Sequence, residues 1–301
     1  MEAAEIFQAI PTAIAPEEID QALKKSNSLE KRKRKLPASL VVCLVIAMSL
    51  WSSDSMETVL QNLVNGLNRQ WTKLGQYWKS PNSSSITIAR QKLGCEVMSR
   101  LFDSIVKPLA TIETPGAFLG GLRVMAVDGT VLDIPDSQAN AKVFGYPGSR
   151  KGTRAAFPKV RVVLLIEAGT HLITDALMCP YRIGERVRVL KLLRSVKESM
   201  LLMWDRGLHS YRMVNATITR GCQYLGRVPA NVKFPAHKVL EDGSYLSWIN
   251  PDRKSQKKGA IPIQVRVIEY TIETDGEVKT YRLITSLMDL ALFPALLLAQ
   301  Q

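Results

Sequence analysis

Two aspartates share one local sequence context. Asp128 follows the short apolar run Val124–Val127, Asp205 follows Met200–Trp204, and a glycine comes within two residues after each aspartate. If both runs are central parallel strands, both carboxylates emerge at the carboxyl edge of the sheet, where α/β proteins build their sites. Convergent carboxylates bind Mg²⁺ (or Mn²⁺), and a pair of such ions supports phosphodiester chemistry at both the attacking and the leaving oxygen.

A turn is the simpler interpretation of either motif, because Asp-Gly is a common turn dipeptide and Asp-Arg-Gly can form one too. The context favours a metal site: an apolar strand precedes each aspartate, a helix is expected between them, and the chain is basic. Its 301 residues include 40 Lys and Arg against 27 Asp and Glu, a formal net charge of +13. This excess indicates a polyanionic partner, either nucleic acid or an anionic membrane surface.

Other site chemistries find little support in the sequence. The four cysteines form no CxxC pair, and the three histidines are dispersed, so neither a zinc ribbon nor a disulfide framework is indicated. The most apolar stretch, Leu36–Trp51, is shorter than the roughly 20 residues that span a bilayer. We therefore expect a buried helix and no membrane partner, with membrane association through this stretch as the remaining alternative.

The periodicity predicts a helical first part, residues 1–115. The expected helices are Pro16–Lys25, Leu36–Trp51, Met56–Leu67 and a single helix over Ile86–Val106. Thr114-Pro115-Gly116 then interrupts the pattern, which places a domain boundary there.

The second part alternates strands and helices, which predicts an α/β domain with a mixed sheet. Strands are expected at Val124–Val127, Val160–Ile166, His171–Met178, Met200–Trp204 and Gln223–Val228, and helices at Glu185–Lys197 and Tyr211–Arg220. Residues 231–280 are β-rich, and Asp275-Gly276 predicts a hairpin between Val265–Glu273 and Glu277–Ile284. A short helix is expected from Pro294.

The chain resembles the DDE transposases of the insertion sequence 4 family. The resemblance rests on Ala126–Thr130, Trp204–Gly207, Ala89–Gly94 and the segments around Ile10-Pro11 and Leu36–Leu67. It implies an all-α N-terminal DNA-binding domain (1–115), an RNase H-like catalytic core (116–230), a β-rich insertion (231–280), and a last core strand with the start of the final catalytic helix (281–301).

The resemblance also implies an activity. It implies cut-and-paste DNA transposition by two-metal phosphoryl transfer, with Asp128 and Asp205 as catalytic residues and ligands of Mg²⁺ or Mn²⁺. The implied partners are double-stranded DNA, both transposon ends and target, and a second copy of the chain on paired ends. The implied location is the cytoplasm, in association with the nucleoid.

The third acid of the family is a Glu on the final helix, in a Tyr-x2-Arg-x3-Glu-x6-Lys pattern. Residues 294–301 contain no acid, so we expect a transposase truncated before its third catalytic acid. The alternative is a catalytically dead DNA-binding remnant that inhibits a full-length relative. None of the other acids weighed for this role is expected to substitute: Asp133, Asp136, Asp175, Glu185, Glu269, Glu273 and Glu277.

Basic and aromatic residues provide candidate DNA contacts. The stretch 149–161 contains no acid, so it suits either phosphate contact or a solvated loop. Arg206 is expected to hold the scissile phosphate or to pair with Asp205. Trp248 is expected to stack on a flipped base or to pack inside the β-rich segment. The full candidate set is Arg90, Arg150, Lys151, Arg154, Lys159, Arg206, Trp248, Lys257 and Lys258.

Overall fold

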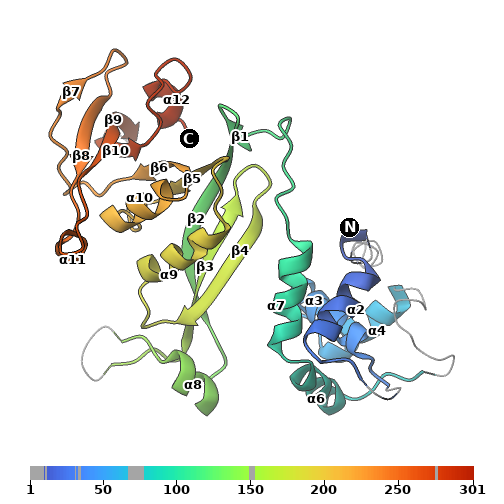
Figure 1. Ribbon diagram of the computed structural model, residues 1–301. Coiled ribbons are helices and arrows are strands. Elements are labelled where there is room, and N and C mark those ends of the chain that lie inside the picture. Colours follow the sequence, from blue (N-terminus) through green and yellow to red (C-terminus); the bar gives the residue numbers. More distant parts are fainter. Residues whose placement is uncertain are drawn as a thin grey trace. The chain divides into compact units, whose positions relative to one another are not determined.

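Helices build the first part of the chain, and a mixed sheet organises the second (Figure 1). The computed structural model describes residue 10, residues 12–30, residue 32, and residues 35–66, 78–148, 153–274 and 277–301. The chain divides into two units, Met1–Val106 and Lys107–Gln301. The division lies close to the end of a helix, somewhat before the boundary expected near residue 115.

The described helices of the first unit are α2 (Pro16–Lys25), α3 (Ala38–Leu50), α4 (Met56–Gly66), α6 (Ser83–Leu93) and α7 (Cys95–Ile105). Helix α3 is apolar on all sides, and most of its residues from Leu40 to Ala47 are buried. A helix that is apolar all round belongs in the middle of a bundle, where its neighbours cover it. Among the described residues, no helix is long and apolar enough to cross a bilayer.

The expectation of one helix over Ile86–Val106 is wrong. Helix α6 ends at Leu93 and α7 begins at Cys95, because Gly94 adopts φ +73° and ψ 171° between them. A positive φ of this kind suits glycine, which has no Cβ to clash with the backbone. The apolar stripe is nevertheless buried as predicted, with Ile86 and Val97 both fully covered.

The second unit is organised by a sheet whose described strands follow the order β4-β3-β2-β5-β6-β10-β9-β8-β7, with β1 (Phe118–Leu119) paired to β2. The core strands are β2 (Leu122–Asp133), β3 (Lys159–Glu167), β4 (Leu172–Pro180), β5 (Met200–Trp204) and β6 (Gln223–Arg227). Strands β2, β5 and β6 are parallel, whereas β3 and β4 are antiparallel to their neighbours. The predicted order of strands and helices is therefore confirmed, and the fold is of the mixed α/β class.

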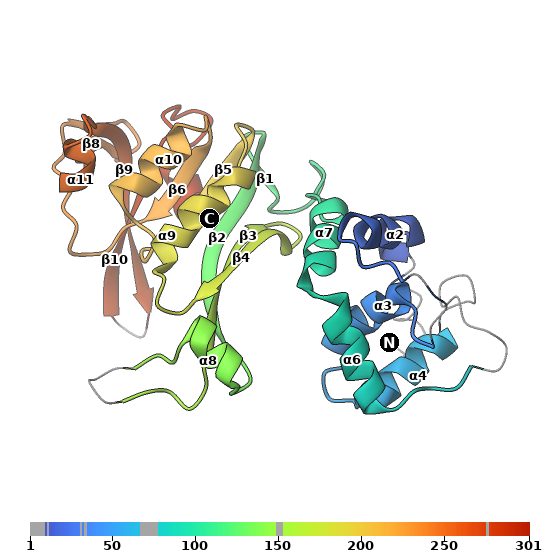
Figure 2. The same ribbon diagram turned by 60° about the horizontal axis from the view of Figure 1, so that its bottom comes forward.

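Both faces of this sheet are covered. Helices α9 (Glu185–Leu192) and α10 (Tyr211–Ile218) lie on one face (Figure 2). They bury Val189 and Val214 against a cluster that includes Leu202 of β5. On the other face, Leu201 packs in a separate cluster with Phe293 and the short helix α12 (Ala295–Ala299). Successive residues of β5 thus face opposite layers, as the pleat of a strand requires.

The β-rich segment continues the core sheet. It contains β7 (Lys238–Val239), β8 (Tyr245–Ile249), α11 (Arg253–Gln256), β9 (Ile263–Thr274) and β10 (Glu277–Thr285), and β10 pairs with β6. The hairpin of β9 and β10 has the predicted register, with Glu277 opposite Thr274, while its turn at 275–276 lies outside the described residues. Two short helices were not predicted from the sequence: α8 (Gln138–Phe144), capped by Ser137, and α11, capped by Asp252.

A buried arginine fixes the segment that precedes α12. Arg266 on β9 is fully buried and forms an ion pair with Asp242. Its guanidinium also donates to the carbonyl oxygens of Leu287 (3.0 Å) and Phe293 (2.8 Å). The same Asp242 carboxylate accepts a hydrogen bond of 2.8 Å from the backbone of Ala295. One side chain therefore ties β9 to the chain on the second face of the sheet.

Arg266→Met should destabilise the protein by about 3–5 kcal/mol, because it removes the cation that pairs with Asp242 and the donor to two buried carbonyl groups. The measurement is the free energy of unfolding in urea. The matched control is Arg212→Met, which breaks an exposed ion pair of 2.8 Å with Asp252 and should cost less than about 1 kcal/mol. Equal losses for both variants would contradict this account of Arg266.

Candidate active site at the carboxyl edge of the sheet

The register of three parallel strands aligns the residues of the candidate site. Val127 on β2 pairs with Trp204 on β5, and Trp204 pairs with Gly226 on β6. The next residues along these strands are Asp128, Asp205 and Arg227. Because parallel neighbours in register advance together, the two aspartates and the arginine follow one another across the sheet. The sequence-based prediction that both aspartates share one edge of the sheet agrees with this register.

The two aspartates have different backbone settings. Strand β2 does not end before Asp128, as the sequence suggested, but continues to Asp133 with β3 as its partner, and Asp128 lies opposite Leu164. The turn interpretation of Asp128-Gly129 is therefore wrong, since β3 supplies the backbone partners that keep this segment extended. By contrast, β5 ends at Trp204, and a turn follows it at once, beginning at Arg206.

Both carboxylates are exposed. Asp128 accepts a hydrogen bond of 2.7 Å from the amide of Gly129, and Asp205 accepts one of 2.9 Å from the amide of Gly207. In the part of the chain that the structure describes, neither is paired with a Lys or Arg. The expectation that Arg206 pairs with Asp205 is therefore wrong. One oxygen of each carboxylate carries a local bond, which orients the group and leaves its other oxygen available.

The position of Asp205 depends on close packing beneath it. The Trp204 ring stacks on Tyr224, with 5.1 Å between ring centroids and 23° between planes. It also covers Gly226 so closely that a Cβ there would lie 2.4 Å from the indole. Glycine at 226 is thus required by this approach. The buried indole fixes the end of β5, and with it the start of the turn that carries Asp205.

A third carboxylate lies next to the pair. Glu185 begins α9, and its Oε1 is so near Gly129 that a Cβ there would lie 2.4 Å from it. Its Oε2 accepts a hydrogen bond of 3.2 Å from Arg161. Burial raises the pKa of Glu185, Arg161 opposes this, and the charges of Asp128 and Asp205 raise the pKa further.

The sequence predicted no catalytic role for Glu185. The signal that could have found it is the start of a helix after β4, which the crossover connection brings back to the edge of the sheet. Five of the other acids have partners of their own, and the sixth, Glu273, is exposed on β9. The five pairs are Asp133 with Lys159, Asp136 with Tyr146, Asp175 with Arg194, Glu269 with Arg282 and Glu277 with Lys279.

The residues present fit a hard divalent cation. Asp128 and Asp205 offer unpaired carboxylate oxygens, which are the ligands that Mg²⁺ and Mn²⁺ prefer, and Mg²⁺ keeps several waters when only one or two carboxylates hold it. Across the described ranges, no group of three or more His, Cys, Asp or Glu side chains has the spacing of a metal site. Glu185, which Arg161 holds, is therefore a neighbour of the two aspartates rather than a third metal ligand.

Few of the candidate DNA contacts lie beside Asp205. Arg206 lines a pocket with it, whereas Lys159 pairs with Asp133 at 2.5 Å and Arg154 lies over the Tyr146 ring. Four further candidates have other surroundings. Arg90 donates to the sulfur of Met56 in the first unit, Trp248 lines a separate pocket with His237, and the exposed Lys257 and Lys258 follow α11. Arg150 and Lys151 lie outside the described residues.

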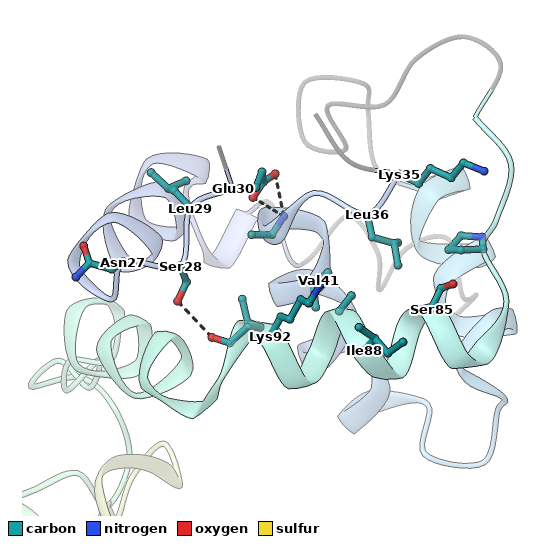
Figure 3. Close-up of a pocket in the computed structure, with 14 residues that line it drawn as sticks. Asn27, Ser28, Leu29, Glu30, Lys35, Leu36, Val41, Ser85, Ile88 and Lys92 are labelled. Carbon is teal, nitrogen blue, oxygen red and sulfur yellow. Dashed lines mark hydrogen bonds between the residues drawn. The ribbon is translucent and has the colours of Figure 1, made fainter. Parts of the chain in front are cut away.

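The first unit contains a pocket of its own, of about 370 Å³, beside α6 (Figure 3). Leu36, Val41 and Ile88 give it an apolar lining. Glu30 closes one side by accepting hydrogen bonds of 3.1 and 3.2 Å from the amide of Ala38 at the start of α3. Among its described lining residues, Glu30 is the one carboxylate.

A buried histidine follows the turn that carries Asp205. Burial, together with the charge of Arg186, lowers the pKa of His209 to about 4. Its ring packs edge-on against Phe234, with 6.1 Å between centroids, and its Nδ1 has no hydrogen-bond partner among the described atoms. The neutral ring is therefore the form that the fold accommodates.

We expect the protein to lose stability between pH 6.5 and about 4, because His209 takes up a proton readily only in the unfolded chain. The loss attributable to this residue should be on the order of 3 kcal/mol. Urea unfolding at both ends of this pH range measures it, and His209→Gln should lose correspondingly less than the unaltered chain. An identical pH dependence in the two proteins would rule out this origin.

Comparison with known proteins agrees with the geometry. Residues 5–103 match the family model of the insertion element 4 transposase N-terminal region, and residues 119–293 match that of the transposase DDE domain. Two relatives come from Escherichia coli (strain K12). The transposase InsG for insertion sequence element IS4 is 26% identical over 284 residues, and the putative transposase InsZ is 24% identical over 246.

The alignments differ in how much of each relative they cover. The chain aligns over 93% of its own length with InsG but spans only 61% of that relative, and the shares for InsZ are 81% and 79%. A solved piggyBac transposase synaptic complex with hairpin DNA aligns with 96% of this chain and 53% of that one, at 12% identity and a TM-score of 0.39. The two family models cover most of the sequence, and the chain belongs to the DDE transposases of the insertion sequence 4 family.

Proposed function

We propose that this chain carries out cut-and-paste DNA transposition by two-metal phosphoryl transfer, with Asp128 and Asp205 as the residues that hold Mg²⁺ or Mn²⁺. The observation that carries the proposal is the register of β2, β5 and β6, which aligns Asp128 on β2 with Asp205 just after β5, both without a Lys or Arg partner among the described residues. Family membership supplies the chemistry: DDE transposase domains use divalent metal ions, and both relatives named above are transposases.

The chain's own residues orient the reaction. Bound metal ions would polarise the scissile phosphodiester and lower the pKa of the attacking water. The amides of Gly129 and Gly207 hold one oxygen of each aspartate, so the other oxygen has a fixed direction. Arg206, exposed and without a carboxylate partner in the described structure, is available to the phosphate. Water would open the strand at the element's end, and the freed 3′-hydroxyl would attack the opposite strand and later the target.

DNA is the proposed partner because the chain carries a net charge of +13 and the site suits a phosphodiester. A second copy of the chain would bring paired ends together, and the place of action would be the nucleoid. The candidate contacts named from the sequence remain part of this proposal, with Arg206 as the one that lies beside Asp205. A DNA-binding protein without nicking activity is the outcome that would replace the enzymatic function.

Asp128→Asn and Asp205→Asn should each lower metal-dependent nicking of a supercoiled plasmid that carries the element's ends by at least about 100-fold, because each removes a charged ligand. Calorimetric titration with Mn²⁺ should show weakened binding in parallel. The matched control is Asp133→Asn on the same strand, where the carboxylate pairs with Lys159, and it should retain activity. If the unaltered chain binds this DNA and never nicks it, the enzymatic proposal fails.

A further inference from the structure

A pocket of about 780 Å³ opens beside Asp205, near the carboxyl ends of β5 and β6 and the middle of β10. Arg206 lines it from the turn after β5, Arg227 from the end of β6, and residues 279–282 from β10. Its cationic side chains are Arg206, Arg227, Lys279 and Arg282, and Asp205 is the carboxylate among the lining residues. A pocket with this balance of charge favours an anion that carries several negative groups.

Two of these cations are already neutralised. Lys279 pairs with Glu277 at 2.9 Å, and Arg282 pairs with Glu269 at 2.7 Å. For Arg206 and Arg227, by contrast, no carboxylate partner occurs among the residues that the structure describes. The pocket therefore offers two guanidinium groups, and a guanidinium fork matches the geometry of a phosphate.

An aromatic stack holds Arg227 in place. Its guanidinium carbon lies 4.4 Å from the centroid of the Tyr281 ring. Tyr281 stacks in turn on Tyr270, its cross-strand partner on β9, with 5.5 Å between centroids and 27° between planes. A guanidinium that rests on an aromatic face keeps its N–H groups free at its edge. The stack restricts the side chain without occupying its donors.

The distance from Arg227 to the aspartates suits a nucleic-acid strand. Arg227 is the next residue in the row after Asp205, one strand away across the sheet, or about 5 Å along the backbone pairing direction. Phosphates repeat about every 3.4 Å of helix axis along one strand of DNA. A strand with its scissile phosphate at Asp128 and Asp205 would thus have its next phosphate within reach of this long side chain.

We propose that Arg227 binds the phosphate adjacent to the scissile one, with Arg206 as a second contact and Tyr281 as the residue that positions Arg227. This assignment rests on the proposed function, because it takes DNA as the substrate of the same site. A phosphate contact contributes affinity and strand position rather than sequence preference. Neither Arg227 nor Tyr281 belongs to the candidate contacts named from the sequence.

The test measures DNA binding without metal, so that it does not depend on catalysis. The probe is a short fluorescein-labelled duplex of mixed sequence, titrated in EDTA over a series of salt concentrations and followed by anisotropy. Arg227→Gln should weaken binding by about 5- to 10-fold near 0.1 M salt and lower the salt slope by about one. Arg227→Lys keeps the charge, so it should keep the slope while losing the forked contact.

The matched control is Arg220→Gln, which removes the same charge from an exposed side chain that precedes the opposite end of β6. It should change affinity by no more than about twofold, since it loses only long-range attraction. Tyr281→Phe should bind like the unaltered chain, whereas Tyr281→Leu should bind less tightly. Arg206→Gln should also weaken binding. Because Arg206 is exposed, this variant provides an independent measurement if Arg227→Gln proves less stable than the unaltered chain.

The outcomes separate this inference from the proposed function. Equal effects of Arg227→Gln and Arg220→Gln would overturn the inference and leave the nicking results at Asp128 and Asp205 intact. If Arg227→Gln does not fold, unchanged binding in both Arg206→Gln and Tyr281→Leu would overturn it. Selective weakening in a chain that never nicks DNA would support the phosphate contact and reject the enzymatic function. No binding of the duplex by the unaltered chain would overturn both.

Discussion

The in-register pairing of three parallel strands is the constraint on which the site depends. It aligns Asp128, Asp205 and Arg227 across β2, β5 and β6, so that two carboxylates and a guanidinium follow one another at one edge of the sheet. The alignment requires glycine at 226, because the Trp204 ring occupies the space that a side chain would need. A slip of one residue in either pairing would turn these side chains to the opposite face.

The sequence predicted much of this arrangement because its signals are local. Apolar runs before Asp128 and Asp205, and helical spacing between them, were sufficient for the order of the core elements. The sequence could not show that β2 continues beyond Asp128, since that depends on pairing with β3. Nor could it show that Glu185 packs on Gly129, or that Tyr281 supports Arg227, because these residues are far apart along the chain.

Net charge alone says little about which cations meet a ligand. Arg266 is buried against Asp242, and Arg123 is paired with the buried Glu167, so both serve the fold. Exposed pairs such as Arg212 with Asp252 neutralise further charge at the surface. Arg206 and Arg227 differ from these because they lie beside Asp205 and have no carboxylate partner in the described structure. The functional information lies in the position of the unpaired charges.

The contrast between the two aspartates has a mechanical consequence. Asp128 belongs to an antiparallel ladder with β3, whereas Asp205 leads directly into a turn. If the two aspartates hold metal ions as proposed, Asp128 would be the stiffer ligand, and small changes of backbone angle would move Asp205 more readily. The sheet thus places a more rigidly held carboxylate, Asp128, and a more movable one, Asp205, in a single row of residues.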